Sequence, residues 1–348
     1  EHVIETKSNV KVLKTAAIYG ANAAGKSNLI KAISFLKSLV VSDVELLVPQ
    51  SKRFRLDEKY INKSSTFRIE FEFDDQHFDY AVEIYKGKIV DEWLYLINSI
   101  NNEKEELLYR RENRNVTFGD YFQKSSDLIY AEKFLKKELR DTQTVLNACY
   151  NVFDENKILD KAFNSFEKIK IFNPDTIDFD YASDILMNQK SNLFTKKLLL
   201  ESKTGIEDLV SEKTKADLFF GYDDSDLQNE LIDIVENNNP ENSDDKLRPA
   251  VHFVRTGSYN AFIKENNEYF VLILKTKHFN SNSLFDLDEE SDGTNRLFEL
   301  SPVFEQLIHE GNIVYLIDEL ERSMHPLLAK ELLKMFSSSQ TNKSQLIF

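Results

Sequence analysis

The sequence predicts an α/β fold with a mixed sheet, an antiparallel β-meander and a large helical insertion. Three observations support this prediction. A strand at 10–19 leads through a glycine-bounded turn into an amphipathic helix. Residues 67–73 alternate apolar and polar side chains with a period of two, and two further strand-like segments follow up to Leu96, which together are typical of an antiparallel meander with one face in water. An apolar strand at 313–318 follows a long segment of mostly helical character.

The remaining elements follow from the same patterns. In the meander we expect strands at 67–73, 78–85 and 89–96. Apolar residues recur at helical spacing from about Tyr121 to Glu236, and the acidic, Asn-rich segment 236–246 predicts a linker or exposed loop. In the rest of the chain we expect strands at 269–274 and 284–287. A helix at 296–309, a strand at 313–318, a helix at 327–336 and a strand at 345–348 follow.

This order of elements predicts three regions in a chain of 348 residues, which is long enough to bury a sizeable core. We expect an N-terminal lobe at 1–118, with the first strand, its helix and the meander. A helical insertion at 119–245 and a C-terminal lobe at 246–348 follow.

Charge and composition limit the classes of function. The chain carries a net charge of −15, from 59 acidic and 44 basic residues. Such a surface repels nucleic acid on average, so DNA or RNA binding is not supported without a local basic patch. The single cysteine, Cys149, excludes an internal disulfide and fits a reducing compartment. No apolar run approaches the length of a membrane span, and we expect a cytoplasmic protein without membrane contact.

The segment GANAAGKS at Gly20–Ser27 matches the phosphate-loop pattern G-x-x-x-x-G-K-[ST]. Small residues let successive backbone N–H groups surround a phosphate, and the following helix presents its positive end to it. Lys26 would reach the β- and γ-phosphates and Ser27 would ligate Mg²⁺. The alternative is a glycine-bounded turn without a ligand. The predicted ATP-binding residues are Gly20, Ala21, Asn22, Ala23, Ala24, Gly25, Lys26, Ser27 and Asn28.

A second motif is the acidic pair Asp318 and Glu319, which ends an apolar strand. Such a strand delivers carboxylates to the carboxyl edge of an α/β sheet, where ligands bind. Asp318 would hold Mg²⁺ through water, and Glu319 would be the general base that polarises the attacking water, with Lys26 as the other catalytic group. By itself the pair fits a helix cap equally well. Together with the phosphate loop, it predicts ATP hydrolysis.

A third motif, ESDGTNRL at Glu290–Leu297, precedes the acidic pair and stands at the start of a predicted helix. Ser291 and Thr294 flank Gly293, so the helix end offers hydroxyls and N–H groups to an anion. A plain N-cap is an alternative, and the two interpretations are compatible because an anion-binding helix end is also a cap.

Together these residues resemble the ATP-binding-cassette (ABC) ATPases of bacterial anti-phage and abortive-infection systems, namely the RloA and AbiL ATPase subunits and the heads of OLD-family nucleases. The matching segments are Gly20–Leu29, Glu289–Leu297 and Leu316–Pro326. The wide separation of Lys26 and Asp318 fits ABC-type heads, in which a helical excursion leaves and re-enters the sheet. The resemblance implies a dimer, or a higher homo-oligomer, that sandwiches ATP. It also implies that Ser291, Gly293 and Thr294 contact ATP bound to the other chain.

The chain departs from the family pattern in two places. It lacks the usual strand and "NFRSF"-like segment before the phosphate loop, and its first residue is Glu1 rather than Met. The strand at 345–348 resembles the one that precedes a switch histidine in the family, yet the sequence stops at Phe348. We therefore expect the sequence to be incomplete at both ends, with room for an effector domain beyond Phe348.

Four other residues are weaker candidates. Gln50 could sense Mg²⁺ but fits a surface turn better. His325 could assist across a dimer but is equally well explained as structural. Trp93 fits the core better than an adenine contact, and Cys149 fits a buried apolar position.

The preferred hypothesis is an ATPase that uses ATP and Mg²⁺ to sense infection or to gate a partner toxin or nuclease. A DNA-maintenance ATPase of the RecF or SMC type is an alternative, disfavoured by the acidic charge and the lack of a long heptad coiled coil. A nucleotide-gated scaffold with little turnover is a third possibility.

Overall fold

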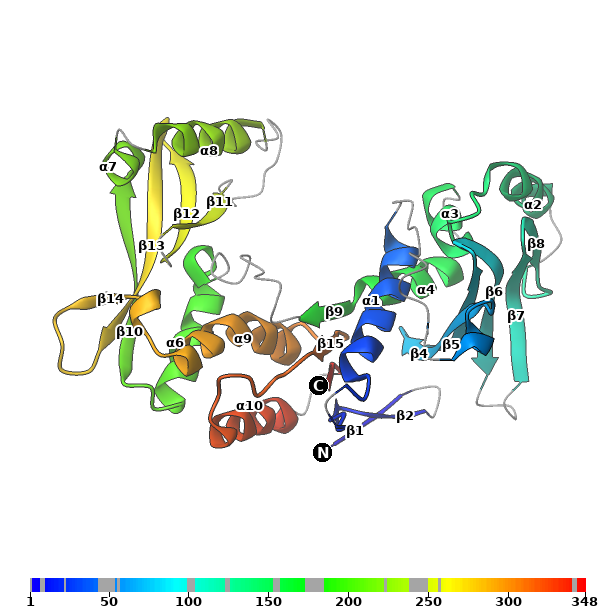
Figure 1. Ribbon diagram of the computed structural model, residues 1–348, viewed down its shortest axis with the longest axis horizontal. Helices are drawn as coiled ribbons and strands as arrows, with labels where there is room; N and C mark the ends of the chain where they lie inside the picture. Colours follow the sequence, from blue (N-terminus) through cyan, green and yellow to red (C-terminus); the bar gives the residue numbers. More distant parts are fainter. Residues whose placement is uncertain are drawn as a thin grey trace. The chain divides into compact units, whose positions relative to one another are not determined.

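The chain forms two compact units in the computed structural model. The first comprises Glu1–Phe172, Asn312–Asp318 and Lys343–Phe348, and the second comprises Asn173–Gly311 and Glu319–Asn342. The structure describes residues 2–6, 10–21, 23–42, 54, 57–98, 104–122, 126–152, 157–172, 185–221, 224–237, 250–255, 258–339 and 343–348. Both units mix helices with sheets, and the predicted α/β class is confirmed (Figure 1).

A parallel sheet of four short strands organises the first unit. Its order is β3-β16-β15-β9, and the strands come from four distant parts of the sequence. Each pairs in parallel with its neighbour, so all four carboxyl ends lie at one edge. Their bounds are Thr15–Ala16 (β3), Gln345–Ile347 (β16), Val314–Ile317 (β15) and Ile169–Phe172 (β9).

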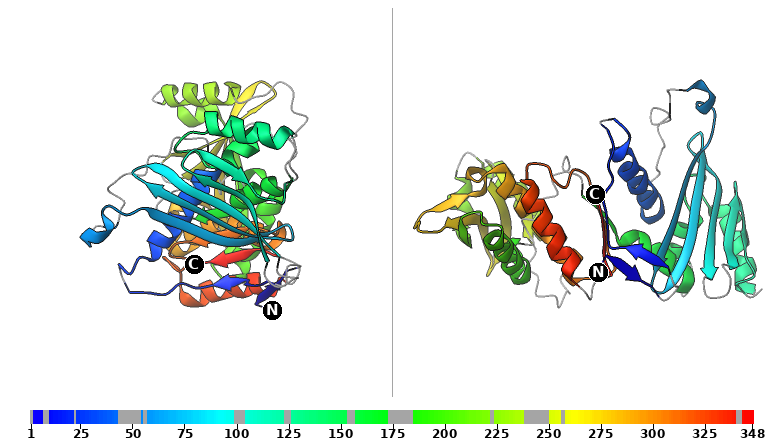
Figure 2. Two further views of the ribbon diagram at one scale, coloured as in Figure 1. Left: turned by 90° about the vertical axis from the view of Figure 1, so that its right-hand side faces the viewer. Right: turned by 90° about the horizontal axis from the view of Figure 1, so that it is seen from below.

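The second sheet of this unit is the predicted antiparallel meander, with strand order β4-β5-β6-β7-β8 (Figure 2). Its strands are Ser65–Phe73 (β4), Gln76–Tyr85 (β5), Lys88–Asn98 (β6), Lys104–Glu112 (β7) and Asn115–Phe118 (β8). The two strands β7 and β8 extend the meander beyond the three strands predicted. A separate hairpin pairs β1 (Val3–Glu5) with β2 (Lys11–Leu13).

Four α-helices complete the described part of the first unit, and all four share its core with the meander. They are α1 (Lys26–Val41), α2 (Ser126–Glu138), α3 (Val145–Val152) and α4 (Lys157–Glu167). Leu36 and Val40 of α1, Leu146 of α3 and Phe166 of α4 are all buried in one hydrophobic cluster with meander residues. A short 3-10 helix, η2 (Glu58–Tyr60), precedes β4.

A buried carboxylate ties α3 to the meander. Glu92 on β6 is fully buried and accepts hydrogen bonds from the Val145 backbone N–H (2.8 Å) and from the hydroxyls of Tyr109 (2.8 Å) and Tyr80 (3.2 Å). Burial raises the pKa of Glu92, and the nearby Arg111 opposes this shift. The guanidinium of Arg111 also donates to three backbone carbonyls. The polar groups of this network are therefore partnered inside the core, as a stable core requires.

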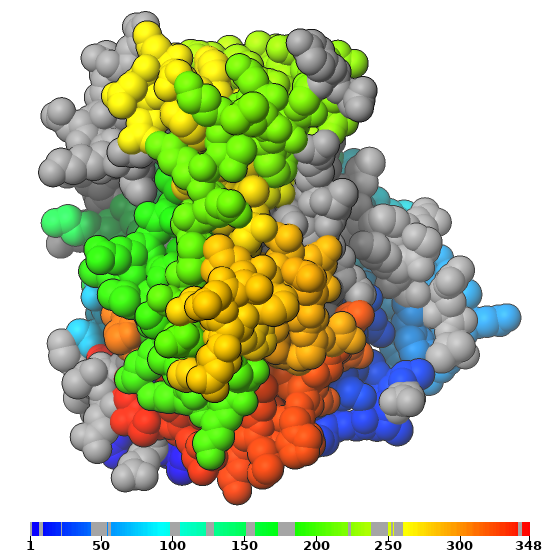
Figure 3. All heavy atoms as spheres, turned by 90° about the vertical axis from the view of Figure 1, so that its left-hand side faces the viewer, coloured from blue at the N-terminus to red at the C-terminus, as the bar shows by residue number. Residues whose placement is uncertain are grey.

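The second unit is built around an antiparallel sheet with order β10-β13-β12-β11, to which β14 adds through β13. The face with β14 is shown as spheres in Figure 3, where β14 is gold. The strands are Ile206–Lys215 (β10), Ala250–Arg255 (β11), Ser258–Glu265 (β12), Glu268–His278 (β13) and Leu284–Asp286 (β14). The helices are α6 (Gln189–Glu201), α7 (Ala216–Phe220), α8 (Ser225–Asn237), η4 (Leu287–Glu289), α9 (Asp292–His309) and α10 (Pro326–Ser338).

Strands β9 and β10 correct the prediction that 121–236 is helical. β10 makes a long antiparallel pairing with β13, in which charged side chains such as Glu212 and Lys275 meet across the strands. These cross-strand pairs stabilise β10. Because many of its side chains are charged, its sequence does not show the alternation of apolar and polar residues by which a strand is recognised. The helices α2 to α4 of the expected insertion belong to the first unit, and α6 to α8 belong to the second. The three-region division itself stays a prediction.

The other predicted elements lie within a few residues of their observed positions, while β11 and β12 were not predicted. The predicted strand at 10–19 is divided between β2 and β3. Most of the predicted linker at 236–246 lies outside the described residues. Among the helices that the structure describes, none is both long and apolar enough to cross a membrane.

Asp141 yields a prediction about stability and pH. Its carboxylate accepts hydrogen bonds from Lys88 (2.8 Å) and Arg114 (2.7 Å), which lower its pKa from 3.8 to about 2. A carboxyl whose pKa is lowered by folding stabilises the fold above its unfolded pKa and loses this effect in acid. We expect Asp141→Asn to lower the free energy of unfolding by about 1 kcal/mol near neutral pH, because such exposed pairs are weak. The difference from the parent should shrink as the pH falls below 3.8 toward about 2.

Chemical unfolding followed by circular dichroism across this pH range measures the effect. Asp120→Asn, at an exposed position after β8, is the matched control and should change little. A pH-independent loss in Asp141→Asn would contradict the assignment.

Candidate nucleotide-binding site

The phosphate-loop segment connects β3 to α1 in the first unit and is held at its base by the parallel sheet. The Ile18 N–H donates to the Phe348 carbonyl (2.6 Å), so the loop leaves the sheet beside β16. Gly20, Ala21, Ala23 and Ala24 are small and exposed, and Gly25 adopts a left-handed φ of 101° that favours glycine. A Cβ at Gly20 would lie 3.3 Å from Ala24 Cβ, so this glycine keeps the loop compact. Asn22 lies outside the described residues.

The start of α1 has the properties of a phosphate-binding helix end. Gly25 is its N-cap, no side chain caps it, and no acidic residue stands in its first turn. The positive end of the helix dipole is therefore not neutralised locally. Lys26 Nζ donates to the carbonyls of Gly20 (2.7 Å) and Ala21 (3.2 Å), which places the ammonium group over the loop. Ser27 is half-buried and Asn28 is exposed at the same helix end.

Asp318 lies at the same edge of the parallel sheet as this loop. It follows β15 directly, is half-buried, and its N–H donates to the Phe172 carbonyl (3.2 Å) at the end of β9. One strand, β16, separates β3 from β15, which corresponds to roughly 10 Å between them. The carboxyl edge of the sheet thus brings together the phosphate loop and Asp318, which both belong to the first unit.

These residues fit a magnesium ion in its usual protein setting. Among the described residues, no three His, Cys, Asp or Glu side chains cluster in a way that could hold a metal. Mg²⁺ needs no such cluster, because it binds through one or two protein oxygens together with phosphates and water. The Asp318 carboxylate and the Ser27 hydroxyl are oxygens of this kind.

The Ser291 motif forms the start of α9 in the second unit. Ser291 is the N-cap, and its Oγ accepts from the Thr294 N–H (3.2 Å) and contacts Thr294 Oγ1 (2.9 Å). Ser291 is exposed, whereas Thr294 is only 7% exposed. The predicted cap is confirmed, and the Thr294 hydroxyl lies against Ser291 rather than facing solvent.

Glu319 begins a turn that packs against this helix end. Its side chain is exposed, and its backbone adopts φ 54°, a left-handed value that non-glycine residues rarely take. Arg296 Nη2 donates to the Glu319 carbonyl (3.0 Å). This contact was not predicted, although Arg296 stands within the third motif and its charge was a visible signal.

The weaker sequence candidates have structural explanations where they are described. His325 is the N-cap of α10 and accepts from the Leu327 N–H (3.3 Å). Trp93 is half-buried in β6, opposite Ala81 and Arg110. Cys149 is buried, and burial raises the pKa of its thiol. Gln50 lies outside the described residues.

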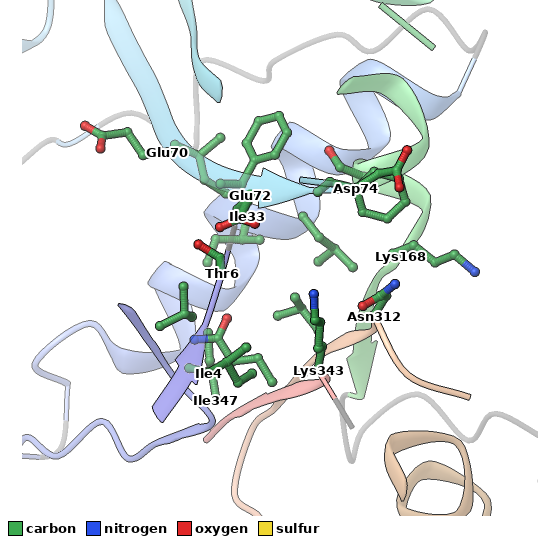
Figure 4. Close-up of a pocket in the computed structure, with 18 of the residues that line it drawn as sticks. Ile4, Thr6, Ile33, Glu70, Glu72, Asp74, Lys168, Asn312, Lys343 and Ile347 are labelled. Carbon is green, nitrogen blue, oxygen red and sulfur yellow. The ribbon is translucent and has the colours of Figure 1, made fainter. Parts of the chain in front are cut away.

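A cavity of about 500 Å³ in the first unit is separate from this site. It lies between β4 and the parallel sheet and has an apolar centre with Ile69 and Leu316. Figure 4 shows Lys168, Asn312 and Lys343 grouped where β9, β15 and β16 begin. The cavity therefore lies along one face of the sheet and reaches its amino edge, whereas the phosphate loop lies at the carboxyl edge.

Comparison with known families agrees with this geometry. Residues 16–129 and 179–348 match the family model described as "AAA domain, putative AbiEii toxin, Type IV TA system". The chain belongs to this family. The match covers the phosphate loop, the Ser291 motif and the Asp318 strand. This protein is thus an AAA-type, P-loop nucleotide-binding protein related to ABC-like ATPases. Membership of the OLD-like anti-phage group stays a prediction.

The chain is similar to two solved structures. One is an SMC head bound to the C-terminal winged-helix domain of ScpA, with 17% identity, 99% of this chain and 87% of that chain covered, and a TM-score of 0.36. The other is the Pyrococcus furiosus SMC head with an extended coiled coil, bound to the C-terminal domain of ScpA. The two sequences are 16% identical, the match covers 99% of this chain and 88% of that chain, and the TM-score is 0.29. No curated protein matches the chain.

Lys26 allows a direct test of the phosphate loop. We expect Lys26→Ala to weaken binding of a fluorescent ATP analogue at least about 100-fold, or about 3 kcal/mol, because it removes charge-assisted hydrogen bonds to phosphate. Lys31→Ala, at an exposed position on the same helix, is the control and should bind normally. Equal affinity in the two variants would show that the loop does not hold the phosphates.

Proposed function

We propose that this AAA-family protein binds ATP with Mg²⁺ at Gly20–Ser27 and hydrolyses it. The observation that carries the proposal is the shared carboxyl edge of the parallel sheet, where the uncapped start of α1 and Asp318 lie in one unit. Backbone N–H groups and Lys26 would bind the phosphates, and Ser27 and Asp318 would hold the magnesium ion. The metal would neutralise charge on the phosphates when bound.

Glu319 is the proposed general base. Its carboxylate is exposed, follows the magnesium-binding Asp318 directly in the chain, and is held on a turn of unusual backbone conformation. A base must lie within hydrogen-bond reach of the water that it polarises, so a fixed backbone is an advantage. In this proposal, Glu319 takes a proton from the water while Lys26 stabilises the charge on the transferred phosphoryl group.

We further propose that two chains complete each other's sites. The start of α9, with Ser291 exposed and Gly293 beside it, would contact ATP bound to a second copy. An exposed hydroxyl at a helix N-terminus is suited to a terminal phosphate. Hydrolysis would then loosen the dimer and change the state of a partner protein.

The proposed partner is a toxin or nuclease of an anti-phage system. The family description names a putative AbiEii toxin and a type IV toxin–antitoxin system, which supports a role in this kind of system. A DNA-maintenance role is the second candidate, and the net charge of −15 disfavours it. The scaffold hypothesis keeps ATP binding and omits rapid turnover.

Glu319→Gln tests the proposed reaction. We expect it to bind ATP normally, to lower kcat at least about 100-fold because the base is lost, and to accumulate a dimer in light-scattering measurements with ATP. Glu321→Gln, two residues later and also exposed, is the control. Turnover by Glu319→Gln at the parental rate would refute the assignment of the base.

The same phosphate-release assay separates the other candidates. Stimulation by double-stranded DNA would favour the DNA-maintenance role. Tight ATP binding with negligible parental turnover, even with the candidate effector added, would favour the scaffold.

A further inference from the structure

Arg296 is a buried cation that connects the start of α9 to the turn carrying Glu319. Its side chain is 4% exposed. Nη1 donates to Glu299 Oε2 (2.8 Å) one helical turn away, and Nη2 donates to the Glu319 carbonyl (3.0 Å). A guanidinium group can make both contacts at once because its N–H groups have a fixed planar arrangement.

The turn that receives this hydrogen bond has an unfavourable backbone. Glu319 and Ser323 have φ values of 54° and 60°, in the left-handed region that L-residues avoid. Such conformations persist only where surrounding contacts impose them. Within the turn, the Glu319 carbonyl also accepts from the Arg322 N–H (3.0 Å).

A second contact between α9 and this turn lies at Gly293. A Cβ added to Gly293 would stand 3.1 Å from the Ser323 carbonyl oxygen, closer than ordinary van der Waals contact. The helix start therefore meets the turn at both of its left-handed residues: Gly293 lies against Ser323, and Arg296 holds Glu319.

We propose that Arg296 is a positioning residue that fixes the Glu319 peptide and so directs its carboxylate toward the attacking water. This inference rests on the proposed function of Glu319 as the base. Because Ser291 and Arg296 belong to the same helix end, a phosphate bound at Ser291 acts on the same rigid element that holds Glu319. In a dimer, ATP bound by one chain would contact Ser291 of the second chain. Through the start of α9, it would thereby influence Glu319 of that second chain.

A purely structural ion pair between Arg296 and Glu299 is the competing explanation, and the two make different predictions. If Arg296 acts through Glu319, Arg296→Ala lowers kcat about tenfold to 100-fold, the cost of a slightly misplaced catalytic group, and leaves ATP affinity within about twofold. If it serves only the ion pair, Glu299→Gln has the same effect as Arg296→Ala. We expect Glu299→Gln to turn over ATP at close to the parental rate, since it keeps the bond to Glu319.

A double-mutant cycle provides the decisive measurement. Arg296→Ala combined with Glu319→Gln should be no slower than Glu319→Gln alone, because residues that act through one another are not additive. Millimolar guanidinium should partly restore kcat of Arg296→Ala, since a polar pocket of about 300 Å³ beside Arg296 gives solvent access. Additive losses, or a loss without rescue, would overturn the proposal.

Gly293→Ala tests the same coupling if Arg296→Ala folds poorly. It leaves Arg296 in place and displaces the turn through the Ser323 contact, so kcat should fall. The affinity of dilute, monomeric protein for ATP should be retained, because in the proposed function Gly293 contacts only ATP that is bound to a second chain. Unchanged kcat in Gly293→Ala and Arg296→Ala would exclude the positioning role. The Glu319→Gln variant, measured alongside, separates the two hypotheses. If it hydrolyses ATP at the parental rate, the proposed base is wrong. If it is inactive while Arg296→Ala keeps the parental rate, only the positioning role of Arg296 is rejected.

Discussion

Parallel pairing of β15 with β16 on one side and β9 on the other is the interaction on which the first unit depends. It joins segments that are remote in the sequence, so its hydrogen bonds must offset a large loop-closure entropy. Burial of Leu316 among residues of the helices and the meander supplies part of that stabilisation. Because all four strands run in the same direction, the loop after β3 and the carboxylate after β15 emerge at one edge.

The Glu92 network shows that a perturbed titratable group need not mark a reactive site. Glu92 is fully buried and its pKa is raised by burial, which are features often found in catalytic carboxyls. Its oxygens are occupied by Val145, Tyr80 and Tyr109, however, and it lines neither described cavity. The carboxylates of the proposed reaction, Asp318 and Glu319, are more accessible to solvent. Their access to solvent and their place in the chain distinguish them.

The parts of the site that could be predicted are those whose chemistry is local in sequence. Gly25 needs a left-handed φ, and Asp318 ends an apolar run, so both can be identified without a fold. The contact of Arg296 with Glu319 could not be predicted, because it depends on how α9 meets a turn elsewhere in the chain. The same holds for β10, whose charged residues suit a strand only because β13 provides partners. Tertiary pairing, rather than local propensity, determined these features.

The position of β16 in the sheet has a consequence for biosynthesis. It lies between β3 and β15, although it follows every other described strand in the sequence. During translation, at roughly 5–20 residues per second, the meander can form from consecutive segments while β3 still lacks its neighbour. The phosphate loop therefore acquires its anchor, the hydrogen bond from Ile18 to Phe348, only when β16 has emerged from the ribosome. In this order of synthesis, the phosphate loop stays without this anchor until the other described strands of the first unit have been made.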